Sequence, residues 1–514
     1  MTGSTEAPTS RRWLSLAGIC TGAGIVWLAF ADLGVAIPTI ADEMDADMSA
    51  LQWANNAFSL VTGALVIAAG RFGDIFGRRR MLLAGVVLFA AFSVVGALAP
   101  GIPALIAGRG LMGVGAALIL PATLALIPPQ FSGRAQLTAF GVWQAVAWGG
   151  QAVGPAIGGA VTDGLGWRWL FWLNIPLAAV AYLVVRGVTP ESKDPGASRR
   201  IDWPGLVTIG LAVFALLYAL TAGPSAGWGS PLVVGMLAGA VLLAGAWFLV
   251  ESRTRDPLVD LRLFRLRPYD GALTANLTMN LAFAGLSYIL VLWLQNVRGY
   301  DAVEAGMLML PSTLGIFLLI PLGGRLNARV GARLPVVVGL VVMSAGLLAL
   351  GAIATDSPLW QMGAALVVVG LGLGLLSTPI SATAVGDVPP DLDGAAAGVF
   401  KMSSMVGGAV GVAVVSALGR GLSARDWHAA AAAQGLGETD IASVQAALVN
   451  SSSFQDAVAS LPQSARQQVT DAVVEAFTTG VGGAMVAVGV LSLVVTVVVL
   501  LVWPRPRARR PAAP

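Results

Sequence analysis

Long apolar runs separated by short polar joints fill the chain from one end to the other. A bilayer core about 30 Å thick takes about 20 helical residues. Fourteen runs approach or exceed that length: residues 14–38, 53–70, 81–99, 104–125, 138–160, 169–186, 204–222, 231–250, 271–295, 305–323, 334–354, 359–379, 395–418 and 480–503. The pattern predicts an all-α membrane protein with fourteen transmembrane helices.

Composition excludes a soluble protein. The 514 residues are 56% hydrophobic and 11% charged, with a mean hydropathy of +0.80, whereas soluble domains carry about 25% charged residues. The only cysteine, Cys20, lies inside the first run, so no disulfide can form within the chain. The first run follows Arg11 and Arg12, is too long for a signal peptide, and is interpreted as a retained helix.

The basic residues predict the orientation. Of the 30 lysines and arginines, 23 lie in joints on the side of the N-terminus, 5 lie in the opposite joints, and Arg109 and Lys401 lie inside runs. Positive-inside asymmetry then predicts that both termini are cytoplasmic in a multi-pass protein of a bacterial cytoplasmic membrane. The net charge of +3 therefore reflects topology, and no nucleic-acid partner is expected.

An internal repeat suggests how the runs are grouped. GRFGDIFGRRR (70–80) follows the second run, GRLNARVGAR (324–333) follows the tenth, and the two align on their glycines. We expect two six-helix halves flanking two extra helices, with a substrate site between the halves. The expected segments are a cytoplasmic N-terminus (1–13), a first half (14–188), linkers and extra helices (189–268), a second half (269–503) and a cytoplasmic tail (504–514). Within the second half, 419–479 is expected outside the bilayer, with short helices at 441–448 and 467–477.

Several motifs together resemble one transporter family. They are residues 70–80, RGLMGVGAA (109–117), GQAVGPAIGG (150–159), WRWLF (167–171), NIP (174–176), DWPG (202–205) and PLVDL (257–261). In this order they resemble the major facilitator superfamily, specifically its fourteen-helix drug:proton antiporter branch (EmrB/QacA type). The resemblance implies efflux of amphipathic or hydrophobic compounds, such as drugs or antibiotics, by alternating access and driven by the proton motive force.

Two motifs contain candidate gating residues. In the first, glycines allow a tight turn and close helix approach, and Asp74 can accept hydrogen bonds from an arginine or a helix N-terminus. The second copy has Ala328 in place of Asp74, which predicts an asymmetric latch. In the second motif, glycines four residues apart share one helical face, and a proline permits a bend. The gating candidates are Gly70, Asp74, Gly77, Arg78, Arg79, Gly150, Gly154, Pro155 and Gly158; the alternatives are a topological anchor for the first motif and plain helix packing for the second.

Charges inside runs are costly and usually face a cavity or a partner. Asp32 and Arg109 both lie about 8 to 9 Å inside the outer ends of their runs, which predicts an ion pair and a proton-coupling role. The resemblance would place the family's usual acid at Ala29, so Asp32 is expected to substitute for it. A purely structural pair and a solvated interfacial Asp32 are the alternatives. Lys401 either snorkels to the cytoplasmic surface or supplies a cation to the cavity.

Polar, aromatic or soft side chains within runs are candidates for the cavity wall. The substrate-binding candidates are Asn55, Met112, Trp143, Gln144, Gln151, Asn276, Asn280, Phe283 and Lys401. Met112 stands where the family commonly has a glutamine. Helix–helix packing is the alternative for each of the amide-bearing and aromatic residues among them.

Enzyme functions are not supported. Neither Lys193 nor Lys401 belongs to a Gly-Lys-Ser/Thr phosphate loop, so no ATP site, no cofactor and no enzymatic activity are expected. The single histidine, His428, supports neither a metal site nor a catalytic pair. The expected partners are small amphipathic molecules, protons and the lipid bilayer, and the protein is expected to be monomeric. Export of a lipid or an endogenous secondary metabolite, and a transporter-like sensor, are the alternatives.

Overall fold

The computed structural model describes residues 9–46, 48–194, 196, 200–254, 256–433 and 463–503, and these residues form helices and loops without a strand. The helices are α1 (Thr9–Ala31), α2 (Leu33–Met44), α3 (Met48–Phe76), α4 (Arg78–Ala97), α5 (Ile102–Ala125), α6 (Gly133–Leu165), α7 (Arg168–Trp172), α8 (Asn174–Val188), α9 (Trp203–Ala226), α10 (Pro231–Glu251), the 3-10 helix η1 (Leu261–Arg265), α11 (Arg267–Asn296), α12 (Ala302–Met307), α13 (Leu310–Val330), α14 (Arg333–Leu350), α15 (Leu359–Ser381), the π-helix η2 (Ala382–Gly386), α16 (Asp393–Ala433) and α19 (Gln463–Val502). The all-α fold class is confirmed.

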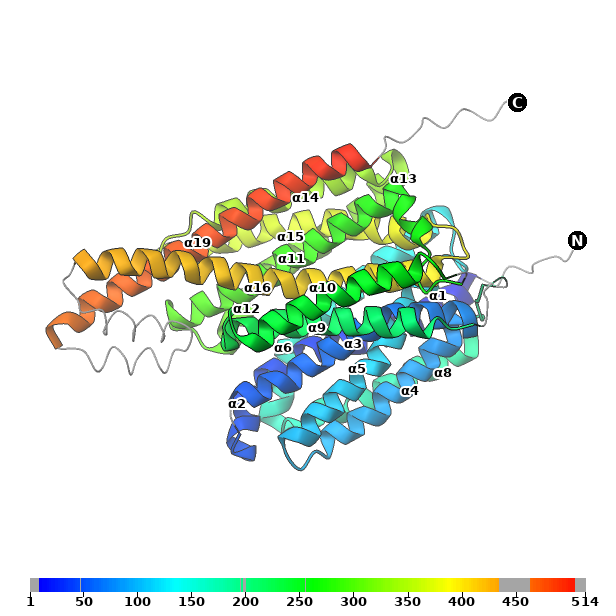
Figure 1. Ribbon diagram of the computed structural model, residues 1–514, viewed down its shortest axis with the longest axis horizontal. Coiled ribbons are helices and arrows are strands. Elements are labelled where there is room, and N and C mark those ends of the chain that lie inside the picture. The colour runs from blue at the N-terminus through cyan, green and yellow to red at the C-terminus, as the bar shows by residue number, and fades with distance from the viewer. Residues whose placement is uncertain are drawn as a thin grey trace, which may run out of the picture.

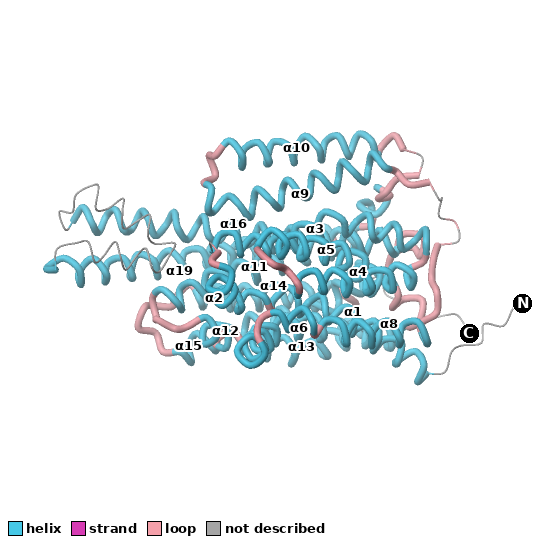
Figure 2. The backbone as a smooth tube through the Cα atoms, turned by 90° about the horizontal axis from the view of Figure 1, so that it is seen from below, coloured by secondary structure: helices cyan, strands magenta, loops and turns pink. Residues whose placement is uncertain are grey.

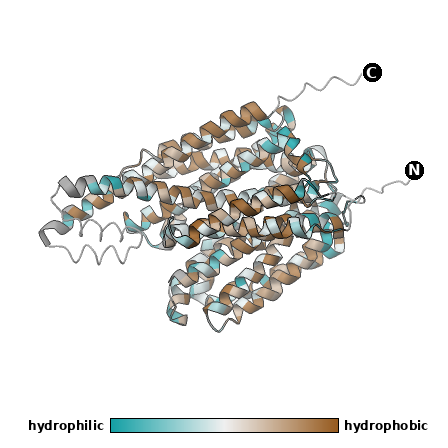
Figure 3. Cartoon of the chain, in the orientation of Figure 1, coloured by the Kyte–Doolittle hydropathy of each residue, from teal (hydrophilic) through white to brown (hydrophobic). Residues whose placement is uncertain are grey.

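Thirteen helical segments in the described residues are long and apolar enough to cross a membrane. The predicted run at 138–160 falls on α6, whose 33 residues are also long enough to cross. Its glycines, Gln144 and Gln151 lower its hydropathy, and its buried face packs on α1 and on α13 of the other half. Figure 3 shows apolar residues along the middle of the helices and hydrophilic ones toward their ends.

The chain forms two bundles side by side, with α1–α8 in one and α11–α19 in the other (Figure 1). The bundles touch along α3 with α16 and along α6 with α13. The extra helices α9 and α10 pack on each other at the edge of the molecule (Figure 2), where α9 contacts both α3 and α16. They are central in the sequence but peripheral in space. We call the end of the bundle where α1 begins and α19 ends the termini side.

The outer surface is apolar. Leucines on several helices expose most of their area, including Leu183 (67%), Leu242 (73%) and Leu314 (68%). Apolar exposure of this extent, spread over the whole circumference, requires lipid as the surrounding solvent. The protein is therefore a multi-pass membrane protein.

The first crossing is longer than its apolar run. It bends at Asp32, where α1 gives way to α2, and α2 continues to Met44. Asp32 is therefore 12 residues, or about 18 Å, from Met44, where this crossing ends opposite the termini side. The depth of 8 to 9 Å predicted for Asp32 is wrong, because polar residues such as Asp42 and Glu43 continue the helix beyond the run.

The long helices α16 and α19 extend beyond the rest of the bundle opposite the termini side (Figure 1). They have 41 and 40 residues, which corresponds to about 60 Å each, twice the bilayer core. Residues 467–477 are the first turns of α19 rather than a separate short helix. The segment 441–448 lies outside the described residues.

Candidate functional site

A buried polar cluster joins the two halves on the termini side. Asp74, near the end of α3, is bonded to Arg78 at 2.8 Å and accepts hydrogen bonds from the backbone N–H groups of Gly394 and Ala395, each at 3.0 Å. Gly394 and Ala395 form the first turn of α16, so a carboxylate of the first half caps a helix of the second half. Asp74 has no exposed area.

Arg78 completes this cluster. Its Nη1 donates to Asp393 Oδ2 at 3.2 Å, and its Nη2 donates to the carbonyl oxygen of Pro390, also at 3.2 Å. Arg78 is 3% exposed and Asp393 is 4% exposed. We call Asp74, Arg78, Asp393 and the N–H groups of Gly394 and Ala395 the latch. Asp393 was not among the predicted site residues, although an acidic residue directly before an apolar run is a helix-start signal.

Glycines allow the close approach that the latch requires. A Cβ on Gly70 would lie 2.3 Å from the carbonyl oxygen of Gly394, so α3 and α16 cross backbone to backbone there. Gly77 adopts φ +109°, which favours glycine and ends α3. Arg79 does not join the latch, because its backbone N–H donates to Glu191 at 3.0 Å and its guanidinium donates to Arg186 O, both in the first half or its linker.

The second copy of the motif forms no such latch. Ala328 lies beside a cavity of about 540 Å³ between α6 and α13, which is also lined by Arg134, Arg325 and Arg329. None of the residues lining this cavity is acidic. The two interfaces between the halves therefore differ on the termini side, as the replacement of the acid by Ala328 predicts.

The glycines of the second motif pack on the first crossing. A Cβ on Gly150 would lie 3.1 Å from Trp27 Cβ, one on Gly154 would lie 2.5 Å from Ala31 Cβ, and one on Gly158 would lie 2.5 Å from the carbonyl oxygen of Asp32. Close packing of α6 on α1 and Asp32 is thus observed. Pro155 lies inside α6 on this stretch, and a role of the motif in closing the cavity stays a prediction.

Arg109 does not bind Asp32 directly. Its Nη2 donates to the carbonyl oxygen of Ala29 at 2.8 Å and to Asn55 Oδ1 at 3.0 Å, and its guanidinium lies 4.7 Å from the ring centroid of Phe58. Both charged residues are buried, with Asp32 4% and Arg109 1% exposed. The expected ion pair is not formed in this conformation, because Arg109 finds its partners one helical turn before Asp32. Asn55, expected in the cavity wall, instead holds Arg109.

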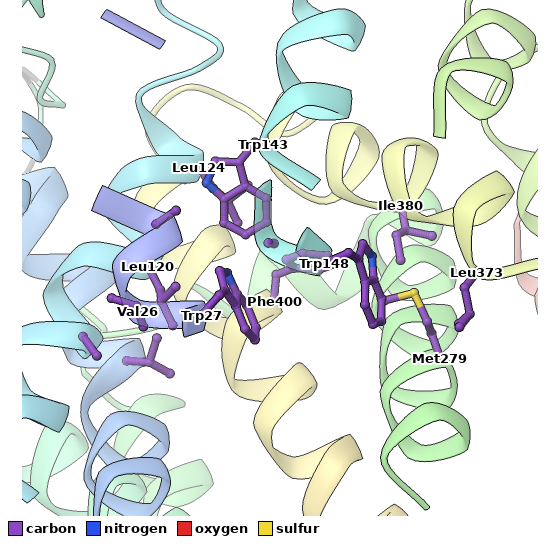
Figure 4. Packing of buried hydrophobic residues seen from close by; sticks show 14 of the residues in the cluster. Val26, Trp27, Leu120, Leu124, Trp143, Trp148, Met279, Leu373, Ile380 and Phe400 are labelled. Carbon is purple, nitrogen blue, oxygen red and sulfur yellow. The ribbon is translucent and has the colours of Figure 1, made fainter. Parts of the chain in front are cut away.

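A small cavity lies between the halves. Its lining includes five of the predicted binding residues, Gln144, Gln151, Asn276, Asn280 and Lys401. The other lining residues are Trp27, Ala147, Trp148, Met279, Phe400 and Ser404. Figure 4 shows Trp27, Trp143, Trp148 and Phe400 gathered at this place. The cavity volume of about 30 Å³ admits water, whereas drug-sized ligands need about 300 Å³ or more. The cavity must therefore widen before a compound of that size can enter.

Four predicted binding residues lie outside this lining, namely Asn55, which holds Arg109, and Met112, Trp143 and Phe283. Trp143 lies behind it, donating to Thr123 Oγ1 at 3.1 Å, and Phe283 packs on Trp148 with ring centroids 4.9 Å apart. Met112 is fully buried and does not line the cavity. Trp27 and Trp148 were not predicted, because an aromatic residue in an apolar run does not reveal which side it faces.

Lys401 does not snorkel to the surface. It is 4% exposed, and its ammonium lies 4.3 Å from the ring centroid of Trp143 and 5.3 Å from that of Trp27. Of the two interpretations of Lys401, the structure therefore agrees with the cation in the cavity wall.

The DWPG motif (202–205) and the PLVDL motif (257–261) meet beside two acidic residues, Asp202 and Glu251, which we call the acidic joint. Asp202 caps α9 through the N–H of Gly205 at 2.9 Å, and Glu251, at the end of α10, accepts from the N–H of Val259. The second oxygens of the two carboxyl groups, Asp202 Oδ2 and Glu251 Oε2, are buried, and the two groups lie within hydrogen-bonding reach of each other. This joint fixes the two extra helices to the segment that leads into the second half.

Comparisons with known proteins agree with this architecture. The family model described as Major Facilitator Superfamily matches residues 15–412. The chain is 35% identical over 409 residues to "Multidrug resistance protein Stp" of Mycobacterium tuberculosis (strain CDC 1551 / Oshkosh), covering 78% of this chain and 75% of that protein. It is 35% identical over 424 residues to "Puromycin resistance protein pur8" of Streptomyces alboniger, covering 82% and 84%.

A solved structure extends the likeness to the fold. The human organic anion transporter MFSD10 (TETRAN) superposes with a TM-score of 0.62 over 95% of this chain and 100% of that chain, at 16% sequence identity. At that identity the likeness concerns the fold alone. With a family model that matches most of its length and two halves joined by a latch, the chain belongs to the Major Facilitator Superfamily.

Proposed function

We propose that this protein exports amphipathic and hydrophobic compounds, including antibiotics and other drugs, across a bacterial cytoplasmic membrane by alternating access. It acts as a monomer with both termini in the cytoplasm, in the fourteen-helix drug:proton antiporter branch. The observation that carries the proposal is the latch: its contacts close the termini side between two halves that enclose a cavity. The names of the relatives, which describe multidrug and puromycin resistance, support the cargo class.

The energy source in this proposal is the proton gradient. Asp32 is an acid buried inside a crossing, at a bend between α1 and α2. Intramembrane carboxyl groups of this kind are expensive and commonly serve proton relays. Asp32 exchanges the proton, and Arg109, held by Ala29 and Asn55, fixes a positive charge one turn away.

The test measures transport of chemically diverse toxic compounds. Cells with and without the gene are compared in a susceptibility panel, and the purified protein is reconstituted in liposomes with and without a pH gradient. We expect lowered susceptibility to several amphipathic compounds and uptake that stops when nigericin collapses the gradient. Unaltered susceptibility together with no transport would indicate a sensor, and transport of lipid or of an endogenous metabolite alone would reject drug export.

A further inference from the structure

The small cavity of about 30 Å³ between the halves has one ionisable side chain in its lining, and that side chain is basic. It is Lys401 of α16. In the described residues no carboxylate lies within salt-bridge distance of Lys401, whereas Arg78 has two such partners. A buried ammonium without a counter-ion is expensive, and a site that keeps one has a use for it.

Aromatic rings stabilise this cation without neutralising it. The ammonium lies near the faces of Trp143, Trp27 and Phe400, at 4.3, 5.3 and 5.3 Å from their centroids. Cation–π contacts of this kind offset part of the desolvation cost, but the cavity stays positive. The other charges in the middle of the bundle, Asp32 and Arg109, are of opposite sign and lie outside the lining.

One donor in the same wall is also unused. The indole Nε1 of Trp27 is buried without a hydrogen-bond partner. By contrast, Trp148 donates to Ser377 Oγ at 3.2 Å, and the Asn276 amide donates to Ser404 Oγ at 2.9 Å. The wall thus offers an ammonium, from Lys401, and an indole N–H without a partner, from Trp27, and both are donors that can bind a negatively charged oxygen.

We propose that the exported compound is an acidic amphiphile, carrying a carboxylate or a phenolate on a flat aromatic body, and that Lys401 is its counter-ion in the cavity. This inference rests on the proposed export function and specifies its cargo. The acidic oxygen binds Lys401 and Trp27, and the aromatic body lies against Trp148 and Phe400. Cationic compounds of the same shape are disfavoured because they meet the Lys401 ammonium in a partly desolvated site.

The experiment uses two dyes of nearly the same shape and opposite charge. Near neutral pH, fluorescein methyl ester is an anion and rhodamine 123 is a cation, and both carry a xanthene ring and a methyl ester. Binding to the full-length protein in nanodiscs is followed by fluorescence anisotropy. We expect the anion to bind at least about tenfold more tightly than the cation, as one ion pair in a partly desolvated site provides.

Substitutions at the two lysines assign the preference to one residue. Lys401→Gln should remove the preference by weakening binding of the anion, Lys401→Arg should keep it, and Lys193→Gln, at the only other lysine, in an exposed linker, should change nothing. A wild-type protein that prefers the cation or fails to bind the anion overturns the proposal even if Lys401→Gln does not fold. An unchanged preference in folded Lys401→Gln also overturns it.

Transport of the same dyes separates this proposal from the one on which it rests. In liposomes with a pH gradient, transport of rhodamine 123 that is independent of Lys401 would leave drug export intact and reject the acidic cargo. Absence of gradient-driven transport for both dyes, together with no change in the susceptibility panel, would reject the export function itself.

Discussion

Replacing Asp74 by asparagine should open the termini side. The Oδ1 atom accepts from Arg78 and Gly394, and Oδ2 accepts from Ala395. An asparagine has the same shape, but its side-chain NH₂ group replaces one of the two acceptor oxygens. In one orientation this NH₂ group faces the donors of Arg78 and Gly394, and in the other it faces the N–H of Ala395. The substitution also removes the charge that pairs with buried Arg78. A charged hydrogen bond contributes about 1.5 to 3 kcal/mol, so a loss of about 3 kcal/mol is expected for the closed state.

That loss corresponds to a shift of about 100-fold in the ratio of closed to open molecules. It can be measured as a distance distribution between spin labels on the two halves. Ser132 and Val330 are exposed on the termini side, one in each half, and Leu165 and Trp360 are exposed on the opposite side. In a background with Cys20 replaced by alanine, Asp74→Asn should lengthen the first distance and shorten the second, while transport slows strongly.

A matched control tests whether the buried contact is responsible. Asp391 lies close to the latch in sequence, but it makes only a 3.7 Å contact with Arg262, and its side chain is 49% exposed. Exposed pairs contribute little, so Asp391→Asn should leave both distances and transport unchanged. Equal effects of the two substitutions, or an unchanged distance distribution in a folded Asp74→Asn protein, would refute the assignment of the latch.

Three further substitutions test the interior. Asp32→Asn should abolish pH-gradient-driven export while dye binding in nanodiscs survives, and coupled transport at the wild-type rate would remove Asp32 from the proton pathway. Gly158→Ala should lower the melting temperature and the transport rate, because the new Cβ would lie 2.5 Å from the Asp32 carbonyl oxygen. The control Gly164→Ala, whose Cβ would have no atom within 4 Å, should change neither. Equal effects of the two substitutions would refute the packing argument. Arg109→Lys should reduce transport, since the shorter side chain must reach both the Ala29 carbonyl oxygen and Asn55 Oδ1, which Nη2 of Arg109 binds, and loses the planar guanidinium that lies over the Phe58 ring. A fully active Arg109→Lys protein would contradict this.

The sequence predicts those features that lipid or backbone geometry imposes directly. The apolar runs predict the membrane-crossing helices because a segment in the bilayer core must be apolar and about 20 residues long. The prediction also holds for α6, although its glutamines and glycines lower its hydropathy. The glycines at 70 and 158 predict close helix crossings because any side chain would collide with a neighbouring backbone. Asp74 could be identified as a gating candidate from its own motif. Its partner Asp393 could not, because nothing near residue 393 indicates which helix of the other half approaches it.

Depth in the membrane is the quantity that hydropathy predicts least well, and the first crossing shows why. Pro38 lacks a backbone N–H and its ring crowds the preceding turn, so the end of the apolar run resembles the end of the helix. In the structure the chain instead bends at Asp32 and continues helically through polar residues to Met44. Counting from Pro38 therefore places Asp32 near the surface and level with Arg109. Once the bend is known, Arg109 has Ala29 and Asn55 as partners, and the buried Asp32 carboxylate, which forms no direct ion pair, is the group to which we assign the proton in the proposed export cycle.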